Sequence, residues 1–225
     1  MATPLDLQEQ EQLDALKAFW KQYGNLITWA LVAALAAYAG LNTWKWWQRD
    51  QATKAAALFD QLDRAAQAGD AQRAGQVFND LKERYPRTAY AEQGAALAAR
   101  VQFERGQLEA ATANLEWLAD HAGEEEYKTV ARLRLAALLL QAKDHAGALK
   151  QLDGATAPSF AALVADRRGD VLMAQGKPDE ARAAYQAAWK AMDEKLEYRR
   201  LIEAKLTALA APPQSAGAAD VGASK

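Results

Sequence analysis

The sequence predicts an all-α protein in which one N-terminal transmembrane helix precedes an α-solenoid, a stack of helical hairpins closed by a C-terminal capping helix. Three observations predict this fold. Residues that favour helix, above all Ala and Leu, dominate the 225-residue chain. One long segment near the N-terminus is uncharged and apolar. Downstream of it, a pattern of small and bulky residues recurs every 33 to 37 residues, as in helical-repeat proteins.

The apolar segment runs for 23 residues, from Gln22 to Trp44, between Lys21 and Lys45. A helix rises about 1.5 Å per residue, so about 20 residues cross a hydrocarbon core ~30 Å thick. Tryptophans flank the segment, as aromatic residues do at membrane interfaces. We therefore predict a transmembrane helix over residues 22–47. Its anchoring side chains are predicted to be Leu26, Ile27, Leu31, Val32, Leu35, Leu41, Trp44, Trp46 and Trp47.

Two other interpretations of this segment are less consistent with its length and flanks. A buried helix of a soluble protein rarely combines such length with aromatic residues at both ends. A cleaved signal peptide is suggested by Ala37-Tyr38-Ala39 before Gly40, which has the form of a processing site. A signal peptide begins with a short positive region, however, and here some 20 residues of mixed charge come first.

Four alanines mark the recurring unit: Ala74, Ala111, Ala148 and Ala181, spaced 37, 37 and 33 residues apart. This spacing is close to the ~34 residues of a tetratricopeptide repeat. Two helices approach closely where the facing side chain is small, and a bulky residue four positions later fills the groove beside it. The predicted packing residues are Ala74, Phe78, Ala111, Leu115, Ala148, Leu152, Gly169, Ala181, Tyr185 and Ala188.

The turns within the repeats are predicted at Gly69, at Gly106, and over residues 143–145 and 176–180. A capping helix is predicted over 194–209, with a basic solvent face of Arg199, Arg200 and Lys205. The residues predicted to seal the last repeat are Leu196, Leu201, Ile202, Leu206 and Leu209. The alternative is a generic alanine-rich bundle, because several copies depart from the pattern. Gln102, for example, takes a place where a large apolar residue is usual.

Solenoids bind partners along the concave face that the first helices of their repeats form. A mixed apolar and charged lining suits an extended peptide, although stacking of the repeats also uses apolar residues. The repeat register predicts a partner groove lined by Gln93, Arg100, Phe103, Leu133, Leu140, Asp166, Asp170 and Met173.

Composition and motifs argue against several function classes. The formal net charge of -2 leaves no positive stripe for nucleic acid. The sequence has no cysteine, and its only histidines, His121 and His145, fall in predicted turns. Phosphate-binding and hydrolase motifs such as the P-loop, HExxH and GxSxG are absent. We therefore predict no enzyme, no catalytic or metal site and no cofactor.

Short motifs along the chain carry a family resemblance. They are Glu11-Gln12, the stretch from Lys17 to Gly24, Val164-Ala165-Asp166-Arg167-Arg168-Gly169-Asp170, and Gly176-Lys177. Together with the single span and weak repeats they resemble the YfgM family, the tetratricopeptide ancillary subunit of the bacterial SecYEG translocon. The resemblance covers nearly the whole chain up to Pro212.

The resemblance implies a single-pass protein of the bacterial inner membrane. Its domains would be a cytoplasmic tail over 1–21, the span over 22–47 and a periplasmic repeat domain over 48–210. The Pro-, Gly- and Ala-rich residues 211–225 are predicted to be disordered. More basic residues follow the span than precede it, so the positive-inside rule alone mildly favours the opposite orientation. That rule weakens for long flanking domains, and the orientation here rests on the resemblance.

The implied partners are the SecYEG translocon, a membrane-anchored periplasmic chaperone of the prolyl-isomerase-like type, and the lipid bilayer. The repeat groove would take an unfolded translocating polypeptide or the chaperone. The implied function is a scaffold that links secreted or membrane polypeptides to periplasmic chaperones. The alternative is an adaptor for another envelope assembly machine, such as cytochrome maturation or cell division.

Overall fold

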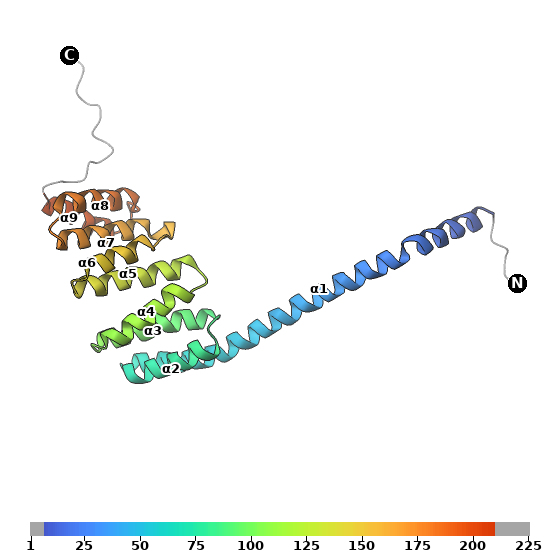
Figure 1. The fold of residues 1–225 in the computed structure, drawn as a ribbon, viewed down its shortest axis with the longest axis horizontal. Coiled ribbons are helices and arrows are strands. Elements are labelled where there is room, and N and C mark those ends of the chain that lie inside the picture. The colour runs from blue at the N-terminus through green and yellow to red at the C-terminus, as the bar shows by residue number, and fades with distance from the viewer. Residues whose placement is uncertain (1–6, 210–225) are drawn as a thin grey trace, which may run out of the picture. The chain divides into compact units, whose positions relative to one another are not determined.

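The computed structural model describes residues 7–209 and is all-helical throughout that range (Figure 1). The predicted all-α fold class is thereby confirmed. The predicted disordered tail, 211–225, lies outside the described residues. The elements are α1 (Leu7–Gln67), α2 (Ala71–Arg84), α3 (Ala89–Glu104), α4 (Leu108–His121), α5 (Glu125–Gln141), α6 (His145–Asp153), the 3-10 helix η1 (Pro158–Phe160), α7 (Ala161–Ala174), α8 (Pro178–Ala191) and α9 (Tyr198–Ala208).

The chain divides into two units, Met1–Gln51 and Ala52–Lys225. Helix α1 runs through both predicted limits of the transmembrane segment, so these limits mark changes of residue type within one helix. Among the described helices, α1 alone is long and apolar enough to cross a membrane. Only 6% of its most apolar 18-residue window is buried, unlike the core helix of a soluble protein.

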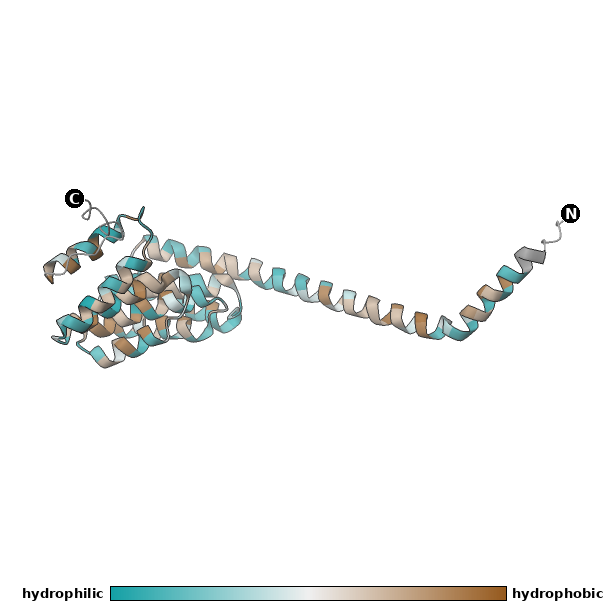
Figure 2. Ribbon diagram, turned by 90° about the horizontal axis from the view of Figure 1, so that it is seen from above, coloured by the Kyte–Doolittle hydropathy of each residue, from teal (hydrophilic) through white to brown (hydrophobic). Residues whose placement is uncertain are grey.

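The second unit consists of helical hairpins that stack in chain order (Figure 1). Residues 52–67 of α1 precede α2, and the pairs α3 with α4, α5 with α6 and α7 with α8 follow. Each hairpin carries both hydrophobic and hydrophilic residues (Figure 2), so stacking is what removes the apolar faces from water. The ten predicted packing residues are all buried.

A small residue explains the closest helix contact of the last hairpin. A Cβ atom added to Gly169 of α7 would collide with the ring of Tyr185 on α8. The absence of a side chain at Gly169 therefore makes room for the aromatic ring at the centre of this hairpin. Gly94 has the same role on α3, where an added Cβ would meet Leu81 and Leu62.

The turn inside each hairpin repeats the same backbone geometry. Gly69, Gly106, Lys143 and Gly176 have φ angles of 65, 75, 62 and 74°. In each turn the N–H of this residue donates to the carbonyl three residues earlier, and the next N–H donates to the carbonyl five residues earlier. This is the Schellman motif, which ends a helix with one left-handed residue. The predicted turn positions therefore share one structural cause.

The capping helix differs from its prediction. It begins at Tyr198 and not at Glu194, because the backbone turns at Asp193, whose side chain accepts a hydrogen bond from the Lys195 N–H at 2.9 Å. Leu196 and Leu201 are 52% and 48% exposed, so the prediction that they are buried is wrong. The other three predicted sealing residues do pack on the last hairpin: Ile202 and Leu206 are buried, and Leu209 is partly buried against them.

Candidate functional site

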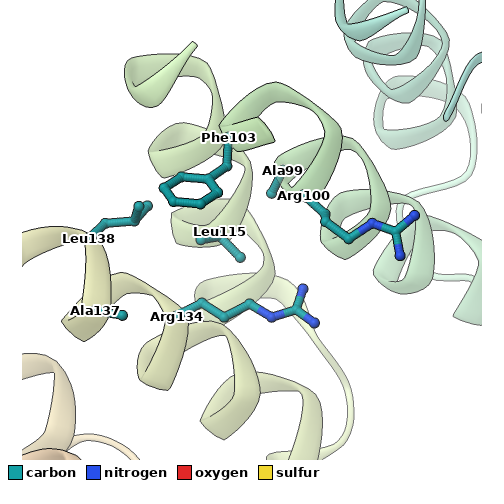
Figure 3. Close-up of a pocket in the computed structure, with 7 residues that line it drawn as sticks. All are labelled: Ala99, Arg100, Phe103, Leu115, Arg134, Ala137 and Leu138. Atoms are coloured by element: carbon teal, nitrogen blue, oxygen red, sulfur yellow. The ribbon is translucent and has the colours of Figure 1, made fainter. Parts of the chain in front are cut away.

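An open cavity of about 270 Å³ lies between the first helices of two neighbouring hairpins (Figure 3). Helices α3 and α5 form its walls, and Leu115 of α4 contributes from below. The cavity is apolar apart from two arginines at its rim. The lining residues are Ala99, Arg100, Phe103, Leu115, Arg134, Ala137 and Leu138.

Helical spacing brings the lining residues together. Ala99, Arg100 and Phe103 are neighbours on the surface of α3, since residues three and four apart lie one turn from each other. Arg134, Ala137 and Leu138 repeat this arrangement on α5. The two alanines leave the space open, whereas Leu115 is almost fully buried. Phe103 remains 43% exposed, so a large aromatic side chain borders the opening.

The two arginines give the rim a positive charge. Arg134 Nη1 donates to the carbonyl oxygen of Ala96 at 3.3 Å, and this bond links the side chain on α5 to the backbone of α3. Burial lowers the pKa of the Arg134 guanidinium, and the positive charge of Arg100 lowers it further. Both groups remain charged at neutral pH, because arginine does not lose its proton in proteins. Arg100 has a distant partner in Glu104, with Nε and Oε1 3.7 Å apart.

A buried polar pair fixes α3 against α4 beside the cavity. Asn114 Nδ2 donates to Gln102 Oε1 at 2.7 Å, and both residues are buried. This pair accounts for the departure of Gln102 from the apolar pattern, because its amide has a partner in the next helix.

A second polar cluster joins α7, α8 and α9. The ammonium of Lys205 lies 2.8 Å from Asp166 Oδ1 and 2.7 Å from Asp170 Oδ1. Tyr198 donates to Asp166 Oδ2 at 2.7 Å, and Tyr185 donates to Asp170 Oδ1 at 2.8 Å. Burial, with the hydrogen bond to Asp166, raises the pKa of Tyr198 to about 12. Its hydroxyl is therefore a neutral donor at ordinary pH.

This cluster corrects two predictions. Asp166 is only 1% exposed and both its oxygens are engaged, so it is not available to a partner in the groove. Lys205 does not lie on a solvent face, and the Arg199 guanidinium stacks over the Trp189 ring at 4.1 Å. At the end of the solenoid, Lys205 and Arg199 are therefore held by side chains of α7 and α8.

The other predicted groove residues are distributed over three helices. Arg100 and Phe103 line the cavity, and Gln93 is exposed on α3. Leu133 and Leu140 are half-buried against the α6 and α7 core instead. Asp170 is partly buried in the polar cluster, and Met173 is exposed on α7. The cavity uses Arg134 and Leu138, which sequence reasoning missed. The periodicity of α5 gave no signal for them, because this helix is apolar on several faces.

Nothing in this geometry assembles a metal centre. Among the side chains that the structure describes, no three of His, Asp or Glu are placed to hold an ion. The cavity presents apolar surface and two cations, which suits recognition of a side chain and an anion.

Comparison with known proteins places the chain in a family. A family model described as a tetratricopeptide repeat-like domain matches residues 17–211. A protein of Neisseria gonorrhoeae named ancillary SecYEG translocon subunit is 29% identical over 204 residues, which cover 90% of this chain and 98% of that protein. A protein of the same name from Escherichia coli K12 is 31% identical over 186 residues, covering 81% and 87%.

A third relative, from Haemophilus influenzae, has the same name and is 27% identical over 185 residues, covering 81% of this chain and 89% of its own length. The name describes a non-catalytic kind of protein. Such a name and one apolar N-terminal helix are consistent with a single-pass protein of the inner membrane. The family match and the similarity over most of both lengths lead to one conclusion: the chain belongs to the YfgM family of ancillary SecYEG translocon subunits, which carry a tetratricopeptide repeat-like domain.

Proposed function

We propose that this protein is a non-enzymatic, membrane-anchored scaffold at the Sec translocon, which links secreted or membrane polypeptides to periplasmic chaperones through the groove of its repeats. One observation carries the proposal. Within residues 7–209, one helix that is long and apolar enough to cross a membrane precedes a repeat unit whose first helices border an open, apolar and positively rimmed cavity. The names of the relatives, ancillary SecYEG translocon subunit, supply the place of action.

The anchor in this proposal is the segment 22–47 of α1. Its large apolar side chains are exposed on all sides, with Leu26 at 68% and Leu35 at 66%. A surface of this kind is stable in lipid, where the helix satisfies every backbone amide internally. The rings of Trp44 and Trp47 pack with centroids 5.2 Å apart at the end of the segment, where an interfacial aromatic belt would lie.

The proposed orientation places residues 1–21 in the cytoplasm and the repeat domain, 48–210, in the periplasm. Tethering raises the effective concentration of the repeat domain beside the channel exit, since binding there becomes an event between neighbours on one membrane. The proposed partners are the translocon, a membrane-anchored periplasmic chaperone of the prolyl-isomerase-like type and the emerging polypeptide.

Site-specific photocrosslinking in intact cells tests this function. A photoreactive residue replaces Phe103 at the cavity, and the control replaces Ala113, which is exposed on α4 and outside the cavity. We expect Phe103 to capture a periplasmic chaperone or a secreted chain, and Ala113 to capture neither. Equal capture from both positions would contradict a role for the groove. Capture of cytochrome-maturation or division proteins alone would contradict a role at the translocon.

A further inference from the structure

We infer that the α3–α5 cavity recognises an acidic, apolar stretch of polypeptide: one bulky apolar side chain enters the cavity, and a carboxylate one or two residues away pairs with Arg100 and Arg134. This inference rests on the proposed function and names the chemistry of the segment that the groove takes. Four features of the described residues support it: apolar walls, two adjacent cations, the spacing between these cations and the apolar end, and the size of the cavity.

The walls favour a bulky apolar side chain. Phe103 of α3 and Leu138 of α5 face each other at one end of the cavity (Figure 3), with Leu115 below. A side chain that fills this space is removed from water, and so is the exposed part of the Phe103 ring. Each group adds to the free energy of binding in proportion to the apolar area that it buries.

The cations favour a carboxylate. The side chains of Arg100 and Arg134 extend in the same direction, away from Phe103 and Leu138 (Figure 3). Among the described residues, no carboxylate lies within ion-pair distance of Arg134, and the Glu104 pair with Arg100 is long and exposed. The two like charges repel each other, so an anion that binds both is stabilised. The planar guanidinium forks match the two oxygens of a carboxylate.

The spacing determines where the carboxylate lies along the ligand. Arg100 precedes Phe103 by three residues, and Arg134 precedes Leu138 by four, so the backbone positions of both arginines lie about one helical turn, roughly 5 Å, from the apolar end, and their guanidiniums extend farther from it (Figure 3). An extended chain advances roughly 3.3 Å per residue. An acidic side chain adds its own length to this advance, so a carboxylate one or two residues from the apolar side chain reaches the arginines.

The size of the cavity favours polypeptide over a free small molecule or lipid. Its volume of about 270 Å³ is below the roughly 300–1,000 Å³ of ordinary small-molecule pockets. One bulky apolar side chain fits inside it, whereas an acyl chain needs a longer apolar channel. The opening lies between the first helices of two repeats, where solenoids receive extended peptides.

Fluorescence anisotropy with the full chain in nanodiscs of zwitterionic lipid tests the inference. The parent probe is a labelled Gly-Ser peptide with one Leu and one Glu two residues later. Two matched probes replace Glu by Gln or Leu by Ala. We expect the dissociation constant of each matched probe to be about tenfold higher than that of the parent, because each loses one of the two contacts.

Protein variants test the same contacts from the other side. Arg134→Gln and Arg100→Gln are expected to weaken parent binding about tenfold and to leave the Gln probe unchanged. Arg73→Gln is the control, since Arg73 is exposed on α2 and outside the cavity. A parent probe that binds no better than the Gln probe overturns the inference, even if an arginine variant fails to fold. Displacement of the probe by laurate but not by excess unlabelled peptide also overturns it.

The same variants separate this inference from the proposed function. If the peptides do not bind while the chain still captures chaperone from Phe103 and co-purifies with SecYEG, the inference fails and the function stands. If capture and co-purification also fail, the proposed function fails.

Discussion

The ammonium nitrogen of Lys205 lies 2.8 and 2.9 Å from the two carboxylate oxygens of Asp166, a residue 39 positions earlier in the chain. Asp166 is almost fully buried on α7, and Lys205 is on the capping helix α9. The cap is therefore held by a charged contact as well as by Ile202 and Leu206.

Removing this cation is expected to destabilise the repeat domain. Lys205→Met keeps the length of the side chain but leaves the Asp166 carboxylate without a cation, and breaking such a buried pair costs roughly 3–5 kcal/mol. The exposure of Lys205 places the expected loss at the low end, about 3 kcal/mol. Urea unfolding of the full chain in detergent, followed by circular dichroism, measures it. Lys190→Met on α8 is the exposed control and should change stability by less than about 0.5 kcal/mol.

The double variant Lys205→Met/Asp166→Asn distinguishes charge from packing. It removes both charges of the Lys205–Asp166 pair, and Asp170 keeps a cation in Arg167, whose Nη1 lies 3.4 Å from Asp170 Oδ2, so much of the lost stability is expected to return. A double variant no more stable than Lys205→Met would show that lost packing, not the unpaired carboxylate, causes the effect.

The left-handed residue of the third turn predicts a stabilising substitution. Lys143 has a φ of 62°, where the other three turns carry glycine. A residue with a Cβ loses about 1–2 kcal/mol of stability in the left-handed backbone region, whereas glycine does not. Lys143→Gly should therefore raise the free energy of unfolding by up to about 1 kcal/mol. Gly106→Ala, with no atom near its added Cβ, should lower it by about 1 kcal/mol through backbone strain alone. A loss of stability in Lys143→Gly, or a gain of stability in Gly106→Ala, would contradict the shared turn geometry.

The buried amide pair predicts strong coupling between two positions. Gln102→Leu leaves the Asn114 amide without its partner, at a cost of about 1–3 kcal/mol. The double variant Gln102→Leu/Asn114→Leu replaces both polar groups and should be close to neutral. Thermal unfolding of the two single variants and the double variant measures the coupling. Additive losses would mean that the hydrogen bond does not matter for stability.

The hydroxyl of Tyr198 predicts a response to alkaline pH. Its pKa is raised from 10.0 to about 12 in the folded chain, so the folded state holds the proton more tightly than the unfolded state does. This contribution to stability is complete below pH 10 and is lost as the pH rises from about 10 to about 12. The tyrosinate absorbance of the full chain minus that of Tyr198→Phe isolates this titration. A difference curve centred near 10 would contradict the bond to Asp166.

The sequence predicts the hairpins well because their causes are local. Small residues such as Ala74 and Ala111 recur at the repeat period, and glycines mark three of the four turns. The lining of the cavity is less predictable. Helix α5 is apolar on several faces, so periodicity does not tell which of Leu133 and Leu138 faces the cavity.

The polar cluster is not predictable from periodicity at all. Asp166 and Lys205 are far apart in sequence, and each is by itself a typical solvent-face residue. Only the packing of α9 onto the last hairpin brings them together. The start of α9 differs from its prediction for another reason: the turn at Asp193 comes from a local hydrogen bond, from the Lys195 N–H to the Asp193 carboxylate, which helical periodicity does not indicate.

Affinity purification of the tagged full chain from its own host in mild detergent tests the central claim most directly. Quantitative mass spectrometry measures SecY against an untagged strain and against a strain with a tagged, unrelated single-span protein. A membrane-anchored translocon scaffold should enrich SecY and a periplasmic chaperone well above both controls. Recovery of SecY at control level, with another envelope assembly machine enriched instead, would contradict it.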